Sequence, residues 1–254
     1  MDKKIALITG ATSGIGLETA RLFAQNNYNL ILTGRRKKRL EEIQNEIESG
    51  SSAQVIILNF DIRNKAEVEL ACENLSREWK QIDVLINNAG LAAGLGPVDS
   101  ADVDDWEQMI DTNIKGLLYM SRLVSRGMIE RQSGHIVNIS SIAGKEAYPN
   151  GSVYCGTKHA VMAISQAMRI EMLPFGVKVS TVSPGATDTE FSLVRFKGDK
   201  QRADKVYEGF TPLYAKDIAE TILFVVSRPP HVNIDDLLVM PTAQGSARDF
   251  FRKA

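Results

Sequence analysis

The chain contains 254 residues, of which 44% are hydrophobic, so it can bury a substantial core. Its formal net charge is −1, which gives no general field to attract nucleic acid or an anionic membrane. The two cysteines do not suggest a disulfide scaffold, and no uncharged run is long enough to span a bilayer. The first residues lack the apolar stretch of a signal peptide, so we expect a cytoplasmic protein.

Short apolar runs alternate with helical patterns along the chain. Strands are expected at 5–8, 30–33, 55–60, 84–87, 135–139, 177–182 and 237–240. Helices are expected from about Lys65, Asp104, Gly116 and Ser152, with a last one at 215–227. Strands that alternate with helices form parallel sheets, so the pattern predicts an α/β fold: a three-layer, doubly wound sheet of seven parallel strands with helices on both faces.

We find no internal repeat, low-complexity tract or linker, so residues 1–254 are expected to form a single domain. The least regular stretch is about 184–211, and long irregular segments of this kind are often lids or binding loops. The tail, 242–254, is polar except for Phe250 and Phe251. These two aromatic residues either dock on a neighbouring subunit or belong to a fraying end.

A glycine-rich turn, Thr9 to Gly16, lies between the first strand and the first helical pattern. Glycines at such a turn let the backbone approach a pyrophosphate, which the positive end of the helix attracts. The spacing is G-x-x-x-G-x-G and differs from the common G-x-G-x-x-G fingerprint. The turn alone is therefore a weak sign of dinucleotide binding, and an ordinary strand–helix turn is the alternative.

The residues after the second strand indicate which dinucleotide is bound. An NAD enzyme usually places an acid here to hold the ribose 2′-hydroxyl, but this chain has a basic run from Arg35 to Arg39 and no acid until Glu41. Arginine pairs with a 2′-phosphate as a fork, so the sequence favours NADP. Arg35 is the first candidate, Arg36 the second, and Ser13 a possible donor from the turn. The rest of the run is expected to be a solvated helix start.

The strongest catalytic signal is Tyr154 followed four residues later by Lys158, because residues at this spacing share one face of a helix. A free tyrosine has a pKa of about 10. A positive charge about 4 Å away supplies roughly 4 kcal/mol at an effective dielectric of about 20, enough to bring that pKa near neutrality. The phenol could then act as a general acid or base. An isolated pair of this kind would more often be a packed tyrosine and a solvated lysine.

Further polar residues follow the predicted strands, where ligands bind in open α/β sheets. They are Asn87 to Gly90, the serines Ser140 and Ser141, and the pair Pro184 and Gly185. Ser141 lies thirteen positions before Tyr154. It is favoured over Ser140, whose hydroxyl is expected to satisfy local backbone.

Together these residues resemble the short-chain dehydrogenase/reductase family over nearly the whole chain. The resemblance rests on the T-G-x-x-x-G-I-G turn, the Asn87–Gly90 run, Asn113, Ser141, the Y-x-x-x-K pair and Pro184-Gly185, in family order. It implies a Rossmann fold with a dinucleotide-binding catalytic domain, and commonly a dimer or tetramer. We expect a homotetramer, with a homodimer as the alternative, and NADP as the cofactor.

The resemblance also implies roles for residues at the matching positions. Tyr154 would be the acid or base, Lys158 would lower its pKa and bind the nicotinamide ribose, and Ser141 would hydrogen-bond the substrate oxygen. Asn113 would hold a water that links Lys158 to a proton relay, and Asp61 would contact the adenine. The cofactor would lie against Gly10, Thr12, Ser13, Gly14, Ile15, Gly16, Arg35, Arg36, Asp61, Ile62, Asn88, Ala89, Gly90, Ile139, Tyr154, Lys158, Pro184, Gly185, Thr187 and Thr189.

Two stretches, 189–199 and 231–241, resemble the NADP-dependent 3-hydroxy acid dehydrogenases, which include serine and L-allo-threonine dehydrogenases. Their substrates carry a carboxylate, and Arg195 could meet it as a fork. The alternative, that Arg195 is a surface or subunit-contact residue, is equally open. The chain departs from this subfamily at Ser125 and Arg126, where an apolar residue and proline are more usual.

The sequence thus predicts an NADP-dependent oxidoreductase that acts on short 3-hydroxy acids such as L-serine, L-allo-threonine or 3-hydroxypropionate. One alternative is an NADPH-dependent reductase of 3-oxoacyl thioesters or other ketones. Another is an NADP-binding protein without turnover, against which the four residues Asn113, Ser141, Tyr154 and Lys158 argue. The three histidines show no metal-ligand spacing, so no metal is expected. The expected partner is a small-molecule substrate, with no nucleic acid or membrane.

Overall fold

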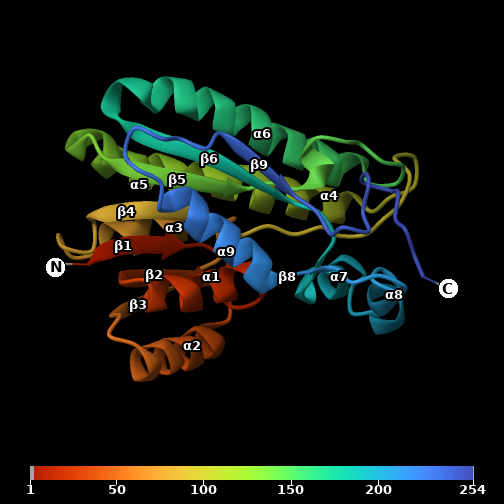
Figure 1. Cartoon of the computed structure of the whole chain (residues 1–254), viewed down its shortest axis with the longest axis horizontal. Helices are drawn as coiled ribbons and strands as arrows, with labels where there is room; N and C mark the ends of the chain where they lie inside the picture. The colour runs from red at the N-terminus through yellow and green to blue at the C-terminus, as the bar shows by residue number, and fades with distance from the viewer. Residues whose placement is uncertain (1–2, 254) are drawn as a thin grey trace.

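The computed structural model describes residues 3–253. Its centre is a sheet of seven parallel strands in the order β3-β2-β1-β4-β5-β6-β9 (Figure 1). Their bounds are β1 (Lys4–Ile8), β2 (Tyr28–Gly34), β3 (Val55–Asn59), β4 (Ile82–Asn87), β5 (Gly134–Ile139), β6 (Val177–Pro184) and β9 (Asp236–Val239). The predicted fold is confirmed, and the strand order reverses between β1 and β4, where α/β sheets of this kind bind ligands.

Helices follow most strands and cover both faces of the sheet. The α-helices are α1 (Gly14–Gln25), α2 (Lys37–Gly50), α3 (Lys65–Glu73), α4 (Val103–Ile110), α5 (Leu117–Arg131), α6 (Ser152–Met172), α7 (Glu190–Arg195), α8 (Lys200–Lys205) and α9 (Ala215–Val226). Shorter turns are the π-helix η1 (Asp111–Gly116) and the 3-10 helices η2 (Ile142–Gly144) and η3 (Leu173–Phe175).

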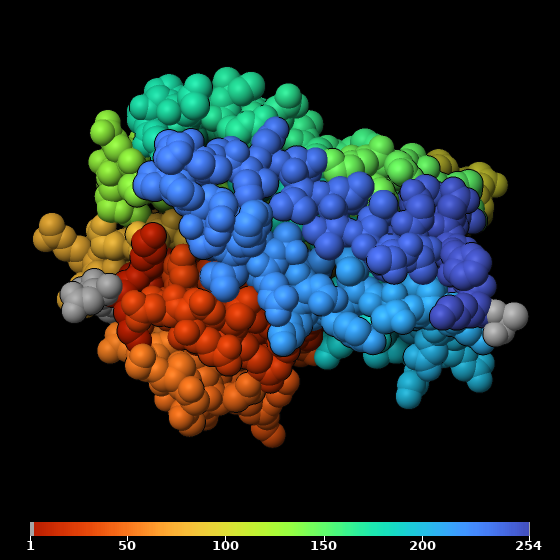
Figure 2. Space-filling view, in the orientation of Figure 1, coloured from red at the N-terminus to blue at the C-terminus, as the bar shows by residue number. Residues whose placement is uncertain are grey.

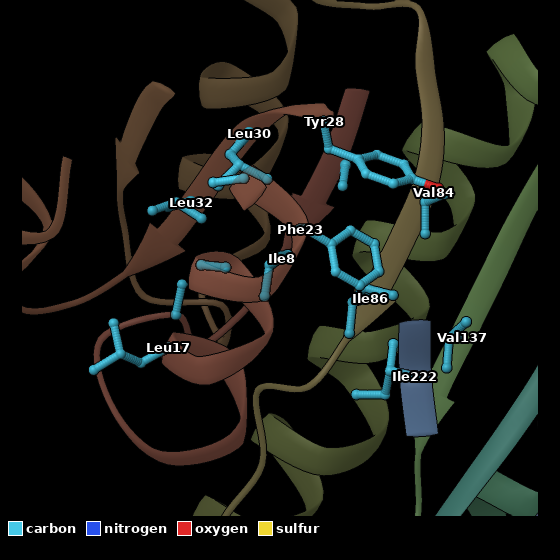
Figure 3. Packing of buried hydrophobic residues seen from close by; sticks show 14 of the residues in the cluster. Ile8, Leu17, Phe23, Tyr28, Leu30, Leu32, Val84, Ile86, Val137 and Ile222 are labelled. Atoms are coloured by element: carbon cyan, nitrogen blue, oxygen red, sulfur yellow. The ribbon is translucent and has the colours of Figure 1, made fainter. Parts of the chain in front are cut away.

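The core consists of two layers because alternate side chains of a strand point to opposite faces. On β1, Ala6 and Ile8 pack with α1, α2 and α9, whereas Ile5 and Leu7 pack with α3, α5 and α6. Figure 3 shows the first layer, in which Phe23 lies among strand residues and α9. Apolar side chains on both faces explain why the strands read as continuous apolar runs.

The helix pattern that was predicted as two helices, from Asp104 and from Gly116, is one uninterrupted helical run. It passes from α4 through η1 into α5. The π-helical turn η1 holds Asn113, one of the predicted catalytic residues, and Gly116, where a Cβ atom would lie 2.9 Å from Ile62. A π turn inside an α-helix is rare and often marks a functional site.

The segment expected to be irregular, 184–211, has more structure than predicted. Two residues each of β7 (Thr187–Asp188) and β8 (Leu213–Tyr214) pair in parallel, and α7 and α8 lie between them. Both helices begin at a capping side chain, Thr189 for α7 and Asp199 for α8. These caps explain why a polar stretch without a long apolar period still forms helical turns.

The C-terminal tail folds back on this segment within the same chain. Phe250 stacks on Phe210 with ring centroids 5.0 Å apart, and the Lys253 amide donates to the carbonyl of Gly209. Figure 2 shows the last residues lying against the chain around residue 210. Phe250 therefore packs against its own chain and does not belong to a fraying end, while Phe251 is 73% exposed. Docking of the tail on a neighbouring subunit stays a prediction. Among residues 3–253 no helix is both long and apolar enough to cross a membrane.

Candidate active site

A cavity of about 590 Å³ opens at the carboxyl ends of the strands. It is lined by residues that follow each strand from β1 to β6, and by α6, α7 and the tail. All the predicted site residues line this one cavity except Gly16 and Asn113. The structure therefore brings together groups from residue 10 to residue 195 that the sequence only suggested were near one another.

The glycine turn after β1 forms the floor of the cavity. Gly10 and Gly14 have φ angles of +66° and +53°, in a region that side chains rarely tolerate. Gly16 lies outside the lining because its hydrogen faces the protein, where a Cβ atom would come 2.5 Å from both Asn88 Nδ2 and the Gly10 carbonyl oxygen. Gly16 thus allows tight packing of the turn, and its contact with the cofactor stays a prediction.

The polar groups after β4 hold the turn in place. The Asn88 side chain donates to the carbonyl oxygens of Thr9 and Gly10, at 2.9 and 3.2 Å. The Thr9 hydroxyl accepts from the amides of Asn88 and Ala89. These bonds fix a backbone cradle at the start of α1, where the helix dipole favours a negatively charged ligand such as a pyrophosphate.

Two arginines stand at the end of the cavity predicted to hold a 2′-phosphate. Arg35 is exposed and lines the cavity. Arg36 donates from Nε and Nη2 to the Thr12 hydroxyl, and its Nη1 forms a 3.0 Å ion pair with Glu190. The ion pair with Glu190 had no signal in the sequence, because 154 positions separate the two residues.

Asp61 lies at the same end and was expected to contact adenine. Its carboxylate accepts from the Arg63 side chain and the Arg63 amide. These hydrogen bonds with Arg63 hold the pKa of Asp61 below its ordinary value. Asp61 is therefore an anchored anion, and its contact with adenine stays a prediction.

Helix α6 presents Tyr154 and Lys158 to the cavity from one buried face. The Lys158 ammonium donates to the Ile139 carbonyl at the end of β5, at 2.9 Å, and burial lowers its pKa to about 8. Burial raises the pKa of the Tyr154 phenol, and the neighbouring Tyr148 raises it further. A hydrogen bond with Ser141 and the charge of Arg195 oppose that rise. The expected effect of Lys158 on Tyr154 stays a prediction.

The two serines after β5 have different surroundings. Ser140 is buried and donates to the carbonyl oxygen of Lys158 at 3.1 Å, so its hydroxyl satisfies backbone as expected. Ser141 lines the cavity and its Oγ accepts from the Ala143 amide at 3.1 Å. That leaves the Ser141 proton for Tyr154 or for a bound oxygen atom.

Asn113 does not line the cavity but is hydrogen-bonded to residues around it. Its Oδ1 accepts from the amide of Leu91, and its Nδ2 donates to the Leu91 carbonyl and to the Thr157 hydroxyl. The Thr157 hydroxyl in turn donates to the Tyr154 carbonyl oxygen. The side chain thus ties the chain after β4 to α6, and the predicted water relay from Asn113 stays a prediction.

Arg195 is the last residue of α7 and lines the cavity beside Tyr154. Its guanidinium carbon lies 5.2 Å from the ring centroid of Tyr154 and 5.6 Å from that of Tyr148. Of the two alternatives that the sequence left open, this position favours a residue that faces the ligand.

The sequence analysis did not identify several of the residues that line the cavity. They are Tyr148, Phe191, Tyr207 and Gln244, of which Phe191 packs on the Tyr154 ring at 5.6 Å and Gln244 accepts from the Ala186 amide. No motif marks them. The aromatic residues of 184–211 were the only available signal, since a polar segment that carries aromatic rings must bury them somewhere.

These features define a dinucleotide-binding oxidoreductase, and the family model described as short chain dehydrogenase matches residues 4–199. The chain belongs to the short-chain dehydrogenase/reductase family, as the sequence indicated.

Two curated relatives are similar over nearly the whole chain. The NADP-dependent 3-hydroxy acid dehydrogenase YdfG of Escherichia coli strain K12 is 45% identical over 244 residues, which cover 96% of this chain and 97% of the relative. The NADP-dependent 3-hydroxy acid dehydrogenase of Schizosaccharomyces pombe is 44% identical over 254 residues, which cover 100% of this chain and 98% of the relative. A solved structure, the closed form of serine dehydrogenase complexed with NADP+, has a TM-score of 0.92 at 43% identity, and covers 98% of this chain and 100% of its own.

Proposed function

We propose that this protein transfers a hydride between NADP and short 3-hydroxy acids such as L-serine, L-allo-threonine or 3-hydroxypropionate. The observation that carries this proposal is the position of Arg195, a cation stacked on the Tyr154 ring within the cavity. A 3-hydroxy acid holds its carboxylate a few bonds from the reacting hydroxyl. A cation beside the catalytic phenol is therefore where such a substrate needs one. The names of the two relatives described above support the same substrate class.

NADP is the cofactor, and it supplies the hydride acceptor for oxidation or, when reduced, the hydride for reduction. The residues present fit it. The positive-φ glycines leave backbone space for the pyrophosphate, and Arg35 and Arg36 stand where the 2′-phosphate requires cations. The absence of an acid between Arg35 and Lys38 fits NADP better than NAD.

The side chains of this protein handle the proton. Tyr154 takes the proton of the substrate hydroxyl in oxidation and returns it to the carbonyl oxygen in reduction. The Ser141 hydroxyl donates to the same oxygen, because its Oγ only accepts from the Ala143 amide and its proton is not used in that bond. Burial opposes ionisation of Tyr154, so positive charges must offset it. Arg195, over the ring, supplies one such charge, and we expect Lys158, one helical turn further along α6, to supply another.

We further propose that residues 1–254 act as one catalytic domain in which 184–211 binds the substrate. Two observations support this. Arg195 and Phe191 both contact Tyr154 from α7. The Tyr207 hydroxyl donates to the Thr187 carbonyl, which ties the far end of the segment to β7.

The test is a panel of substrates at saturating NADP, with NADPH formation as the readout. L-serine, L-allo-threonine, 3-hydroxypropionate and 3-hydroxybutyrate should be oxidised with higher kcat/KM than uncharged secondary alcohols of equal size. The reverse reaction should be assayed with a 3-oxoacyl thioester and with an uncharged ketone. No oxidation of any acid, together with efficient reduction of the thioester or ketone, would reject the proposal in favour of a ketone reductase.

A further inference from the structure

Tyr148 is a second tyrosine in the cavity, six positions before the catalytic one, and its ring is held rigidly. It lies between η2 and α6, and a Cβ atom on Gly151 would come 2.1 Å from the ring. The backbone of Gly151 therefore packs directly against the ring at the start of α6. Any other residue at position 151 would force the ring to move.

The hydroxyl of Tyr148 holds the guanidinium of Arg195. Arg195 Nη2 donates to this oxygen at 2.5 Å, and the guanidinium lies between the rings of Tyr148 and Tyr154. The other end of the arginine is fixed as well, because its carbonyl oxygen accepts from the Gly94 amide at 3.0 Å. A flexible side chain is thus anchored at its backbone and at its tip.

One donor of this anchored arginine is left over. Arg195 Nε is buried and has no hydrogen-bond partner among residues 3–253. A buried donor without a partner is costly, and in a cavity it indicates that a ligand atom completes the bond. Nε and Nη2 lie on the same edge of the guanidinium, the edge that grips a carboxylate as a fork.

The Tyr148 hydroxyl also has a hydrogen to give. It accepts from Arg195, so its own proton is not used in that bond; the Cys155 side chain, a weak acceptor that a carboxylate would outcompete, is its other neighbour. Burial raises the pKa of Tyr148, although the charge of Arg195 opposes the rise, so the phenol keeps this proton at neutral pH.

We propose that Tyr148 and Arg195 together form the carboxylate site of the substrate, with Tyr148 both fixing the guanidinium and donating its hydroxyl proton to the carboxylate. This inference rests on the proposed function, since it assumes an acid substrate. On this inference Tyr148 is a specificity residue. Its hydroxyl recognises the carboxylate and neither gives nor takes the proton that Tyr154 transfers.

The test compares charged and uncharged substrates on the Tyr148→Phe variant, which keeps the ring and removes the hydroxyl. The KM for a 3-hydroxy acid should rise at least about tenfold, because hydrogen bonds to charged groups are among the stronger ones. The kcat/KM for an uncharged alcohol or ketone should stay close to that of the parent. A matched control is Tyr119→Phe, which removes a phenol hydroxyl from α5, outside the residues that line the cavity.

A double variant separates positioning from a general structural effect. In an Arg195→Gln background, Tyr148→Phe should raise the KM by clearly less than it does alone, because the two residues serve one carboxylate. Full additivity, or an equal loss on charged and uncharged substrates, would overturn the inference. If the parent protein oxidises 3-hydroxy acids and Tyr148→Phe leaves their KM unchanged, the inference fails while the proposed function stands. If the parent oxidises no acid, the proposed function itself fails.

Discussion

Burial of the Lys158 ammonium in the folded protein is unfavourable for folding, because the charge loses contact with water. Lys158 is 6% exposed, and burial lowers the pKa of its ammonium to about 8. Lysine is seldom buried to this extent unless it is paired, and here its ammonium donates to the Ile139 carbonyl. A buried lysine that lines the same cavity as Tyr154 is best explained by a role in the chemistry proposed for this site.

The cost of burying Lys158 predicts how stability depends on pH. Below pH 8 the lysine is charged in the folded and unfolded chains, so the burial penalty is present in full. Between about 8 and the unfolded value of about 10.4 the unfolded chain binds more protons, so stability from this group rises with pH. Lys158→Met removes the penalty, and this variant should be more stable than the parent at neutral pH.

The measurement is urea unfolding of the parent and of Lys158→Met on both sides of pH 8. The advantage of the variant should shrink as the pH rises through this value. An advantage that is constant across the range would mean that Lys158 is not charged in the folded protein at neutral pH.

At the scale of elements, α7 connects the two ends of the cavity. Its first residue, Glu190, pairs with Arg36 at the cofactor end, and its last residue, Arg195, lies over Tyr154 at the substrate end. Its capping residue Thr189 sits against the glycine turn, since a Cβ atom on Gly14 would lie 3.2 Å from it. On the role proposed for Arg36, a 2′-phosphate would compete with Glu190 for its guanidinium.

This competition predicts the effect of Glu190→Gln. Both side chains of the pair are about half exposed, so the bond is worth up to about 1 kcal/mol. Removing the carboxylate frees Arg36 and takes away a charge that repels phosphate. NADP should then bind about twofold to fivefold more tightly, with little change for NAD.

Isothermal titration with each dinucleotide measures the change, and Glu42→Gln is the matched control. Glu42 pairs with Arg39 on α2 in a similarly exposed ion pair, and neither residue lines the cavity. Equal tightening for NAD and NADP, or weaker binding of NADP, would contradict the assignment of Arg36 to the 2′-phosphate.

The elements that could be predicted are those whose signal is local. The Tyr154–Lys158 spacing and the apolar strands are readable because each depends on a few adjacent residues. Contacts between α7 and distant residues could not be predicted from the sequence. Arg195 contacts Tyr148 across 47 positions, and Arg36 contacts Glu190 across 154. The π turn at Asn113 also has no local signature in the sequence, because a single π turn differs from an α-helical turn by only about one residue.

At the scale of the whole molecule, several large apolar side chains remain exposed. Ile170 and Leu173 are 66% and 74% exposed at the end of α6 and in η3. Phe224 on α9 and Leu238 on the edge strand β9 are also exposed. Exposed apolar groups and an unpaired sheet edge favour association, so the expectation of a homotetramer stands as a prediction.

Light scattering on the purified protein tests the subunit number. The expected mass is four times that of the 28.0 kDa chain. Leu238→Asp should reduce the tetramer to a dimer, because a charge on the edge strand β9 opposes its pairing with another subunit. A monomer at all concentrations would refute both the tetramer and the homodimer alternative.

The account depends most on Tyr154 as the group that moves the proton. The direct measurement is NADPH formation from a 3-hydroxy acid by Tyr154→Phe, with NADP binding measured on the same sample. We predict that turnover falls by at least about a hundredfold, the usual contribution of a general acid or base, while the affinity for NADP stays nearly unchanged. Turnover that stays close to the parent value, in a variant that binds NADP normally, would contradict the catalytic role given to this tyrosine.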